Sequence, residues 1–193
     1  MRRALSFLLV LAVAAAVVVG LTQVGGTPKT QTGPRFELQR ALDSLKGSPA
    51  PLDSLHAQAS QLLGGEVPAF RARMKALRGH PVVINKWGSW CGPCRSEFPI
   101  FQRASVRHGR RVAFLGLDGR DNRGEASAFL ADFPLTYPSY VDYDEKIARA
   151  IGIPNNYPIT AYVDERGRTA YIHQGPYNTD ADIDRDIERY LGA

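Results

Sequence analysis

The sequence predicts an α/β fold in which helices flank a mixed β-sheet, preceded by an N-terminal membrane anchor. Three observations predict it. From residue 82 onward β-rich segments alternate with segments of helical periodicity, the last two β-rich segments flank a tight turn, and residues 4–21 carry no charge. Alternating strands and helices are typical of a sheet covered on both faces, and a terminal hairpin adds antiparallel strands to it.

The composition fits a globular protein and excludes disorder as the dominant state. The chain has 193 residues, of which 44% are hydrophobic and 22% charged, so it can bury a sizeable core. Two cysteines cannot build a multi-disulfide framework or a four-cysteine zinc site. The formal net charge is +5, but basic residues do not cluster with aromatic ones. Nucleic acid is therefore not an expected partner.

Residues 4–21 form the predicted anchor. The run sits at the lower length limit of a membrane-spanning helix and exceeds the usual apolar region of a signal peptide. It ends in Val-Val-Val-Gly-Leu, which matches a signal cleavage site poorly, so we favour an uncleaved anchor over a cleaved signal. Arg2 and Arg3 precede the run, which predicts that the chain beyond about residue 25 is extracytoplasmic.

The chain after the anchor is predicted to start with a flexible tether. Residues 25–34 are rich in Gly, Thr and Pro and offer little to bury. Apolar residues recur at helical spacing over 36–45 and 55–63, with a helix breaker at 47–51 between them. The predicted organisation is an anchor (1–25), a linker with short helices (26–65) and a folded domain (66–193).

The folded domain is predicted to open with a helix from Pro68 to Gly79, since proline suits a first helical turn and glycine a helix end. The remaining elements follow from apolar periodicity. Strands are expected at 82–87, 112–118, 139–141, 159–164 and 169–174, and helices at about 92–108, 125–133, 145–152 and 180–192. Glu165 to Arg168 form the tight turn of the terminal hairpin.

Cys91 and Cys94 stand between a predicted strand and a predicted helix. Gly92 and Pro93 between them suit the entry into a helix, which places Cys91 at the helix N-terminus. Unpaired backbone N–H groups and the helix dipole favour a thiolate there, so we predict that Cys91 is the exposed nucleophile and Cys94 the shielded thiol. Residues three apart on a helix are close enough to form a disulfide that opens and closes without refolding.

Other uses of the two cysteines are disfavoured. So short a loop makes Cys91–Cys94 a poor structural staple. Arg95 stands where a covalent haem motif needs histidine. A zinc site needs further ligands, and none of the histidines has ligand spacing to the pair (His56, His80, His108 and His173). We expect no metal, and no cofactor other than the redox-active disulfide itself.

Residues 81–99, PVVINKWGSWCGPCRSEFP, resemble the thioredoxin-like superfamily, and in particular its membrane-tethered TlpA/ResA/CcmG branch of thiol-disulfide oxidoreductases. The resemblance extends over about residues 66–193, because the later segments follow in family order. It implies that Cys91 attacks a substrate disulfide and that Cys94 resolves the mixed disulfide. It also implies protein thiol or disulfide substrates and a thiol electron donor or acceptor in the membrane.

Glu97 matches a position where this branch carries a functional glutamate. It lies three residues after Cys94 on the same helix face, and it could deprotonate Cys94 if burial raises its pKa. The alternative is a solvated helix acid. Two residues before the cysteines differ from the family pattern. Asn85 replaces the buried carboxylate of many thioredoxins, and Lys86 occupies a position where a large apolar residue is common.

Pro158 matches the family's cis-proline, which lets the backbone of Tyr157 pair with the substrate chain. Pro154 is the competing candidate for that position. Trp90 is expected to touch substrate or to pack at the rim of the site. The expected substrate-binding residues are Trp90, Gly92, Pro93, Tyr157 and Pro158.

The sequence therefore predicts an anchored, monomeric thiol-disulfide oxidoreductase that reduces specific extracytoplasmic protein disulfides, such as apocytochrome c cysteines. Gly92-Pro93 resembles the dipeptide of reducing thioredoxins. Two alternatives stay open. The pair could donate its disulfide as an oxidant, or the domain could be a non-catalytic binding or chaperone module with a docking dithiol.

Overall fold

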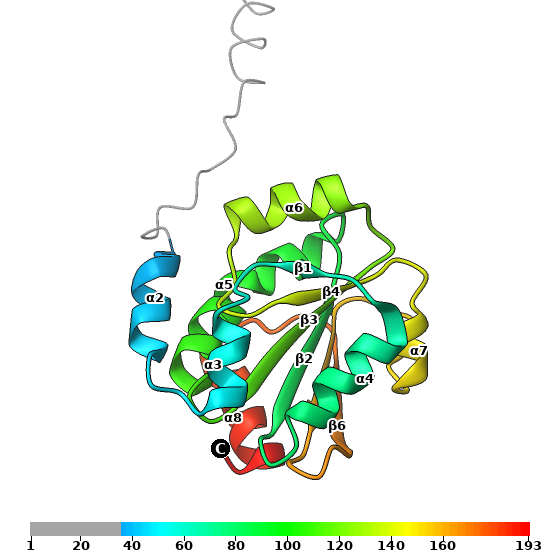
Figure 1. Cartoon of the computed structure of the whole chain (residues 1–193). Coiled ribbons are helices and arrows are strands. Elements are labelled where there is room, and N and C mark those ends of the chain that lie inside the picture. The colour runs from blue at the N-terminus through cyan, green and yellow to red at the C-terminus, as the bar shows by residue number, and fades with distance from the viewer. Residues whose placement is uncertain (1–35) are drawn as a thin grey trace, which may run out of the picture. The chain divides into compact units, whose positions relative to one another are not determined.

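Strand β2 (Val82–Trp87) lies inside a six-stranded mixed sheet and is buried along its whole length (Figure 1). It pairs in parallel with β3 (Ala113–Gly119) and antiparallel with β5 (Ile159–Val163). The strand order is β1-β4-β3-β2-β5-β6, with β1 (Leu62–Leu63) and β6 (Thr169–Gln174) at the two edges and β4 (Ser139–Asp142) between β1 and β3. The mixed sheet predicted from the alternating elements and the terminal hairpin is confirmed.

The computed structural model describes residues 36–193. The predicted anchor at 4–21 and the predicted tether at 25–34 lie outside these residues. Within residues 36–193, no helix is both long enough and apolar enough to cross a membrane.

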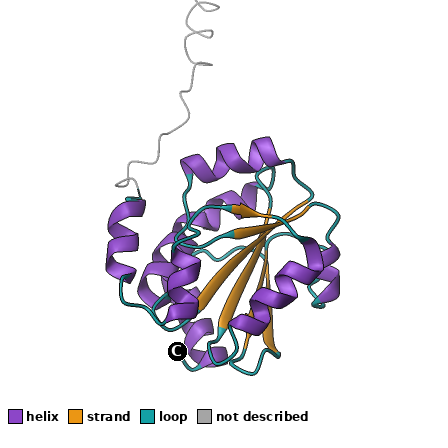
Figure 2. Ribbon diagram, in the orientation of Figure 1, coloured by secondary structure: helices purple, strands orange, loops and turns teal. Residues whose placement is uncertain are grey.

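Helices cover both faces of the sheet (Figure 2). Because strand side chains alternate, Val83 and Trp87 join one apolar cluster, and Val82 and Ile84 join the other. The first cluster includes α5 (Gly92–His108), α6 (Arg123–Asp132) and α8 (Asp180–Leu191). The second includes α3 (Ala50–His56), α4 (Glu66–Ala76) and α7 (Lys146–Ala150).

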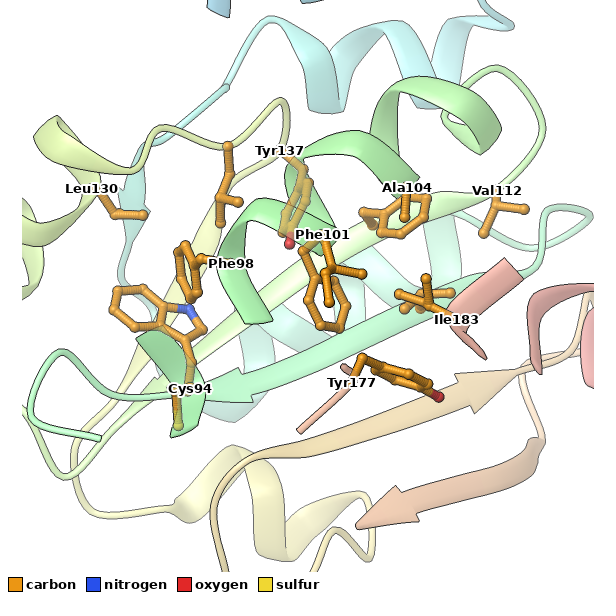
Figure 3. Close-up of a cluster of buried hydrophobic side chains, with 14 of the residues drawn as sticks. Cys94, Phe98, Phe101, Ala104, Val112, Leu130, Tyr137, Tyr177 and Ile183 are labelled. Carbon is orange, nitrogen blue, oxygen red and sulfur yellow. The ribbon is translucent and has the colours of Figure 1, made fainter. Parts of the chain in front are cut away.

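The first apolar cluster extends to the start of α5. Figure 3 shows Cys94, Phe98, Phe101 and Ala104 following one another along this helix into the core. The Trp87 ring packs edge-to-face on Phe98, with ring centroids 5.1 Å apart. The first turn of α5 is therefore fixed by core packing as well as by its backbone.

The predicted helix over 55–63 is wrong. Helix α3 starts at Ala50, because Pro51 occupies its first turn, where a missing N–H costs nothing, rather than breaking the chain. The helix ends at His56, Ser60 adopts a left-handed backbone conformation (φ 57°), and Leu62–Leu63 form β1. The other predicted strands and helices of the described chain are present, within a few residues of the expected ends.

Residues Phe36–Ala193 form one compact unit, which starts earlier than residue 66. Ala41 and Leu45 of α2 (Leu38–Leu45) are buried, and α3 contributes Leu52 and Leu55 to the second apolar cluster. The segment before residue 66 thus supplies part of the core.

This contribution is testable with Leu52→Ala. Leu52 is fully buried, so its truncation removes apolar burial and leaves a cavity, and we expect the free energy of unfolding to fall by about 2–5 kcal/mol. Urea denaturation measures it. Ser54→Ala on the exposed side of the same helix is the control and should change stability by less than about 0.5 kcal/mol. Equal effects of the two substitutions would contradict the packing of α3 on the sheet.

Candidate active site

A disulfide joins Cys91 and Cys94 at the N-terminus of α5. Cys91 is the N-cap residue, and the backbone N–H of Cys94 donates to its Sγ over 3.2 Å. Gly92 and Pro93 form the exposed first turn between the two cysteines. The predicted place of Cys91 at a helix N-terminus is confirmed, and in the reduced state this N–H and the helix dipole would stabilise a Cys91 thiolate.

Cys91 is less accessible than predicted. In the disulfide form it is 4% exposed and Cys94 is 0% exposed, so the expectation of an exposed Cys91 is wrong. The physical reason is that both cysteines belong to the first apolar cluster of the core. Cys94 is still the more shielded of the two, and the exposed surface beside them belongs to Trp90, Gly92 and Pro93.

Glu97 is completely buried on α5, so the alternative of a solvated helix acid is wrong. Asn85 Nδ2 donates to its Oε1 over 2.9 Å, and the backbone N–H of Tyr177 donates to its Oε2 over 3.0 Å. Burial raises the pKa of Glu97 to about 8, and these two hydrogen bonds only partly oppose the rise. Glu97 lies one helical turn after Cys94 in the sequence of α5, and its raised pKa allows it to hold or release a proton near neutral pH.

The peptide bond between Tyr157 and Pro158 is cis, as expected from the family match, and Pro154 is not a cis-proline. Ile159 pairs with Lys86 across β5 and β2, which places Pro158 at the sheet edge where the cysteine loop begins. Tyr157 packs edge-to-face against Trp90, with ring centroids 5.0 Å apart. Pro158 is buried and Tyr157 half-buried, so Tyr157 is the more accessible of the two predicted contacts.

Trp90 lies at the rim of the site. Among the residues that the structure describes, it is the large apolar side chain left exposed, at 52%. Its Nε1 donates to the carbonyl of Gly119 over 3.3 Å. Trp90 therefore presents an apolar ring to solvent while its indole N–H is held by the protein, which suits contact with a partner chain.

Asp121 fixes the loop that leads to Trp90, a role the sequence analysis missed. Its Oδ2 accepts a hydrogen bond from the backbone N–H of Ser89 over 2.6 Å, and its Oδ1 accepts one from the Ser89 hydroxyl over 3.0 Å. Asp121 lies 32 residues from Ser89, so no local sequence pattern signals this contact.

Asp118, on β3, is a second buried carboxyl group. Burial raises the pKa of Asp118 to about 8, and the negative charge of the neighbouring Asp121 adds to the rise.

Lys86 forms a buried ion pair that the sequence analysis also missed. Its Nζ lies 2.7 Å from Glu145 Oε1 and 2.9 Å from the carbonyl oxygen of Pro154. Burial would raise the pKa of Glu145, but hydrogen bonds from Lys86, Tyr157 and Arg120 outweigh it and hold this pKa below its ordinary value. Lys86, which differs from the apolar residue common at this position in the family, is thus paired with a buried carboxylate.

No group of three or more His, Cys, Asp or Glu side chains within residues 36–193 is arranged to hold a metal ion. The electron-carrying group in this part of the chain is the cysteine pair.

Comparisons with known proteins support a redox site. The Redoxin family model matches residues 63–188, which is more than half of the chain. The thiol-disulfide oxidoreductase ResA of Geobacillus thermodenitrificans is 28% identical over 117 residues, covering 60% of this chain and 66% of that protein. The thiol:disulfide interchange protein DsbE of Escherichia coli is 30% identical over 131 residues, covering 62% and 69%. A solved thiol:disulfide interchange protein of the thioredoxin family from Chlorobium tepidum is similar in structure, with a TM-score of 0.55, 25% identity and coverage of 61% and 84%.

Glu97→Gln should change how stability depends on pH. The pKa of Glu97 rises from 4.5 to about 8 on folding, so its stabilising contribution is complete below pH 4.5 and is lost as pH rises toward 8. Between these limits the wild type should lose stability relative to Glu97→Gln, by up to about 1.4 kcal/mol per pH unit. Urea unfolding of the oxidised proteins from pH 5 to pH 8 measures this. The exposed Glu188→Gln should follow the wild type, and parallel profiles for wild type and Glu97→Gln would contradict the buried protonated state.

Proposed function

Because this chain belongs to the redoxin family, we propose that its Cys91–Cys94 pair reduces disulfide bonds of proteins outside the cytoplasm. The chain is a thiol-disulfide oxidoreductase, as its family and its similarity to ResA and DsbE show. These matches also confirm the resemblance to the thioredoxin-like superfamily. The proposal adds the direction of electron flow, the kind of substrate and the compartment.

The observation that carries the thiol-disulfide exchange in this proposal is the position of Cys91 as N-cap of α5, with the Cys94 N–H directed at its sulfur. The Cys91 thiolate would attack one sulfur of a substrate disulfide, form a mixed disulfide and release one substrate thiolate. The Cys94 thiolate would then attack Cys91 Sγ, close the Cys91–Cys94 disulfide and release the second substrate thiol. Two electrons pass to the substrate, and a thiol donor must reduce the pair again.

Glu97 would take up the proton that Cys94 loses in the second step. Its pKa of about 8 lies close to that of an ordinary thiol, so a proton can move between the two groups without a large energetic penalty. Its two hydrogen bonds, from Asn85 and from the Tyr177 backbone, hold the carboxyl group in one place.

The burial of Cys94 supports the reducing direction. An apolar environment disfavours a thiolate, so the reduced pair gains less from ionisation and gives up its electrons more readily. The second candidate, an oxidant, is favoured by the helix N-terminus at Cys91, which stabilises the thiolate of the reduced state. The balance of these two effects sets the reduction potential.

A single measurement separates the two directions. We expect the reduction potential of the Cys91/Cys94 couple to lie below about −220 mV, toward the thioredoxin value of about −270 mV. Equilibration with glutathione or dithiothreitol buffers, followed by alkylation of free thiols, measures it. A potential near about −120 mV, the range of a strong oxidant, would overturn the reducing direction.

Turnover tests the roles of the two cysteines. With dithiothreitol as donor, the wild type should reduce the disulfides of insulin, and Cys91→Ser should abolish this activity because the attacking sulfur is gone. Cys94→Ser should instead accumulate mixed disulfides between Cys91 and protein substrates, visible on non-reducing gels. Mixed disulfides in Cys91→Ser but not in Cys94→Ser would reverse the assignment. Reduction of insulin by Cys91→Ser at the wild-type rate would support the non-catalytic alternative.

The proposed compartment follows from residues 4–21 and the preceding Arg2 and Arg3. We expect the full-length chain to fractionate with the membrane, to resist alkaline extraction, and to be degraded by protease added to the outer face of the cytoplasmic membrane. N-terminal sequencing of the native protein should start at or near Met1. A start near residue 25 would remove the anchor but keep the compartment, and protection from external protease would overturn the proposed location.

A further inference from the structure

The carboxylate of Glu145 joins three other segments around the cysteine site. Lys86 Nζ of β2 lies 2.7 Å from its Oε1, and the hydroxyl of Tyr157, just before β5, donates to the same oxygen over 2.8 Å. Arg120, in the loop after β3, holds Oε2 with Nε at 3.0 Å and a second nitrogen at 2.9 Å. One side chain thus fixes the relative positions of β2, the β3–α6 loop and the segment before β5.

Stability alone does not account for this cluster. The side chains of Lys86 and Glu145 are 1% and 7% exposed, and a buried ion pair often stabilises a fold no better than apolar residues of the same volume. Glu145 and Arg120 also have left-handed backbone conformations, with φ of 56° and 54°, which side chains other than glycine rarely adopt. Such conformations gather at sites where geometry serves function.

Tyr157 connects this cluster to the rim of the cysteine site, because its ring contacts both Lys86 and Trp90. The Tyr157 ring lies beneath Lys86 Nζ, 4.1 Å from the ring centroid, and its edge meets the Trp90 ring at 5.0 Å. Gly119 leaves the room that this arrangement needs, because a Cβ there would collide with the Tyr157 hydroxyl. Trp90 directly precedes Cys91, so the position of Tyr157 determines what surface a substrate meets beside the reactive sulfur.

A cleft of about 700 Å³ opens on the α6 side of this rim. It is lined by both aromatic and polar side chains, including Trp90, Arg120, Asp121, Glu125 and Phe129. A cleft with an apolar side at Trp90 and hydrogen-bonding groups along its length offers contacts of the kind that a segment of polypeptide uses.

We propose that Lys86 and Glu145 are a positioning pair that, with Arg120, holds Tyr157 and Trp90 as a fixed aromatic rim for the polypeptide segment beside a substrate disulfide. The inference rests on the proposed reduction of protein disulfides and adds how such substrates are distinguished from small disulfides. Neither Lys86 nor Glu145 touches the reacting sulfurs. Their effect is on binding of the substrate chain.

The expected signature is a change in KM for protein substrates alone. Glu145→Gln keeps the side-chain volume but removes the charge that holds Lys86, Arg120 and Tyr157. We expect it to raise the KM for insulin reduction roughly tenfold, a typical effect of disturbing a recognition contact, and to leave kcat within about twofold. The rate with cystamine, a small disulfide without a polypeptide chain, should not change.

Two more variants and one control sharpen the test. Lys86→Met removes the cation but keeps an unbranched apolar side chain, and Tyr157→Phe removes only the hydroxyl bonded to Glu145. Both should raise the KM for insulin in the same direction. Asp180→Asn breaks the partly exposed Arg103–Asp180 pair between α5 and α8, far along α5 from the cysteines, and should leave KM unchanged. All measurements use the full chain, and circular dichroism and thermal melting establish that each variant is folded.

Acrylamide quenching of tryptophan fluorescence gives a readout independent of activity. The chain has two tryptophans, and Trp87 is completely buried, so quenching reports mainly on Trp90. Loss of the pair should loosen Tyr157 and increase quenching in Glu145→Gln and Tyr157→Phe but not in Asp180→Asn.

The outcomes decide between the proposals. Unchanged KM and unchanged quenching in folded Glu145→Gln and Tyr157→Phe would overturn the positioning role. An equal fall in the rates with insulin and cystamine would also overturn it, because it would indicate damage to the cysteine site. If the wild type reduces cystamine but no protein disulfide, the proposed function fails, and quenching alone then supports or overturns the fixed rim.

Discussion

The alternation of side chains along β2 is the constraint on which the site depends. The strand is buried on both faces, so each of its side chains projects into one of two apolar layers. Asn85 points to the layer of α5 and Lys86 to the layer of α7. A buried polar group needs a partner, and the partners here are Glu97 on one face and Glu145 on the other. The last residues of one strand thus organise both sides of the cysteine loop.

The two buried glutamates differ because their partners differ. Glu97 receives hydrogen bonds from a neutral amide and a backbone N–H, so burial dominates and its pKa rises to about 8. Glu145 accepts hydrogen bonds from Lys86, Tyr157 and Arg120, and these bonds together with the Lys86 charge outweigh burial and lower its pKa. Glu97 is therefore able to exchange a proton near neutral pH, whereas Glu145 keeps its negative charge. The same residue type thus titrates in opposite directions because its neighbours differ, which suits Glu97 to the proposed proton transfer and Glu145 to a permanent negative charge.

Much of this could be predicted from the sequence because the signals are local. Helical and strand periodicity located the described elements after residue 66, and Gly92-Pro93 placed Cys91 at a helix N-terminus. Pro51 misled the prediction because proline both breaks helices and begins them, and the difference depends on tertiary packing. Three contacts were not predicted: Tyr177 with Glu97, Asp121 with Ser89, and Glu145 with Lys86. The two residues of each pair lie 80, 32 and 59 positions apart, and contacts over such separations follow from the fold rather than from local spacing.

The low exposure of Cys91 directs attention to the rim of the site. Cys91 is 4% exposed, whereas its sequence neighbours Trp90, Gly92 and Pro93 are exposed, so in the proposed reaction a substrate disulfide would meet their surface beside the reactive sulfur. The α5 side of β2 carries the cysteines and Glu97, the proposed proton acceptor, whereas on the opposite side Glu145 accepts from Tyr157, which packs against Trp90. The proposed roles therefore assign chemistry and recognition to opposite faces of one strand. In this arrangement a change on the Lys86 face would alter which substrates are reduced without altering how the sulfurs react.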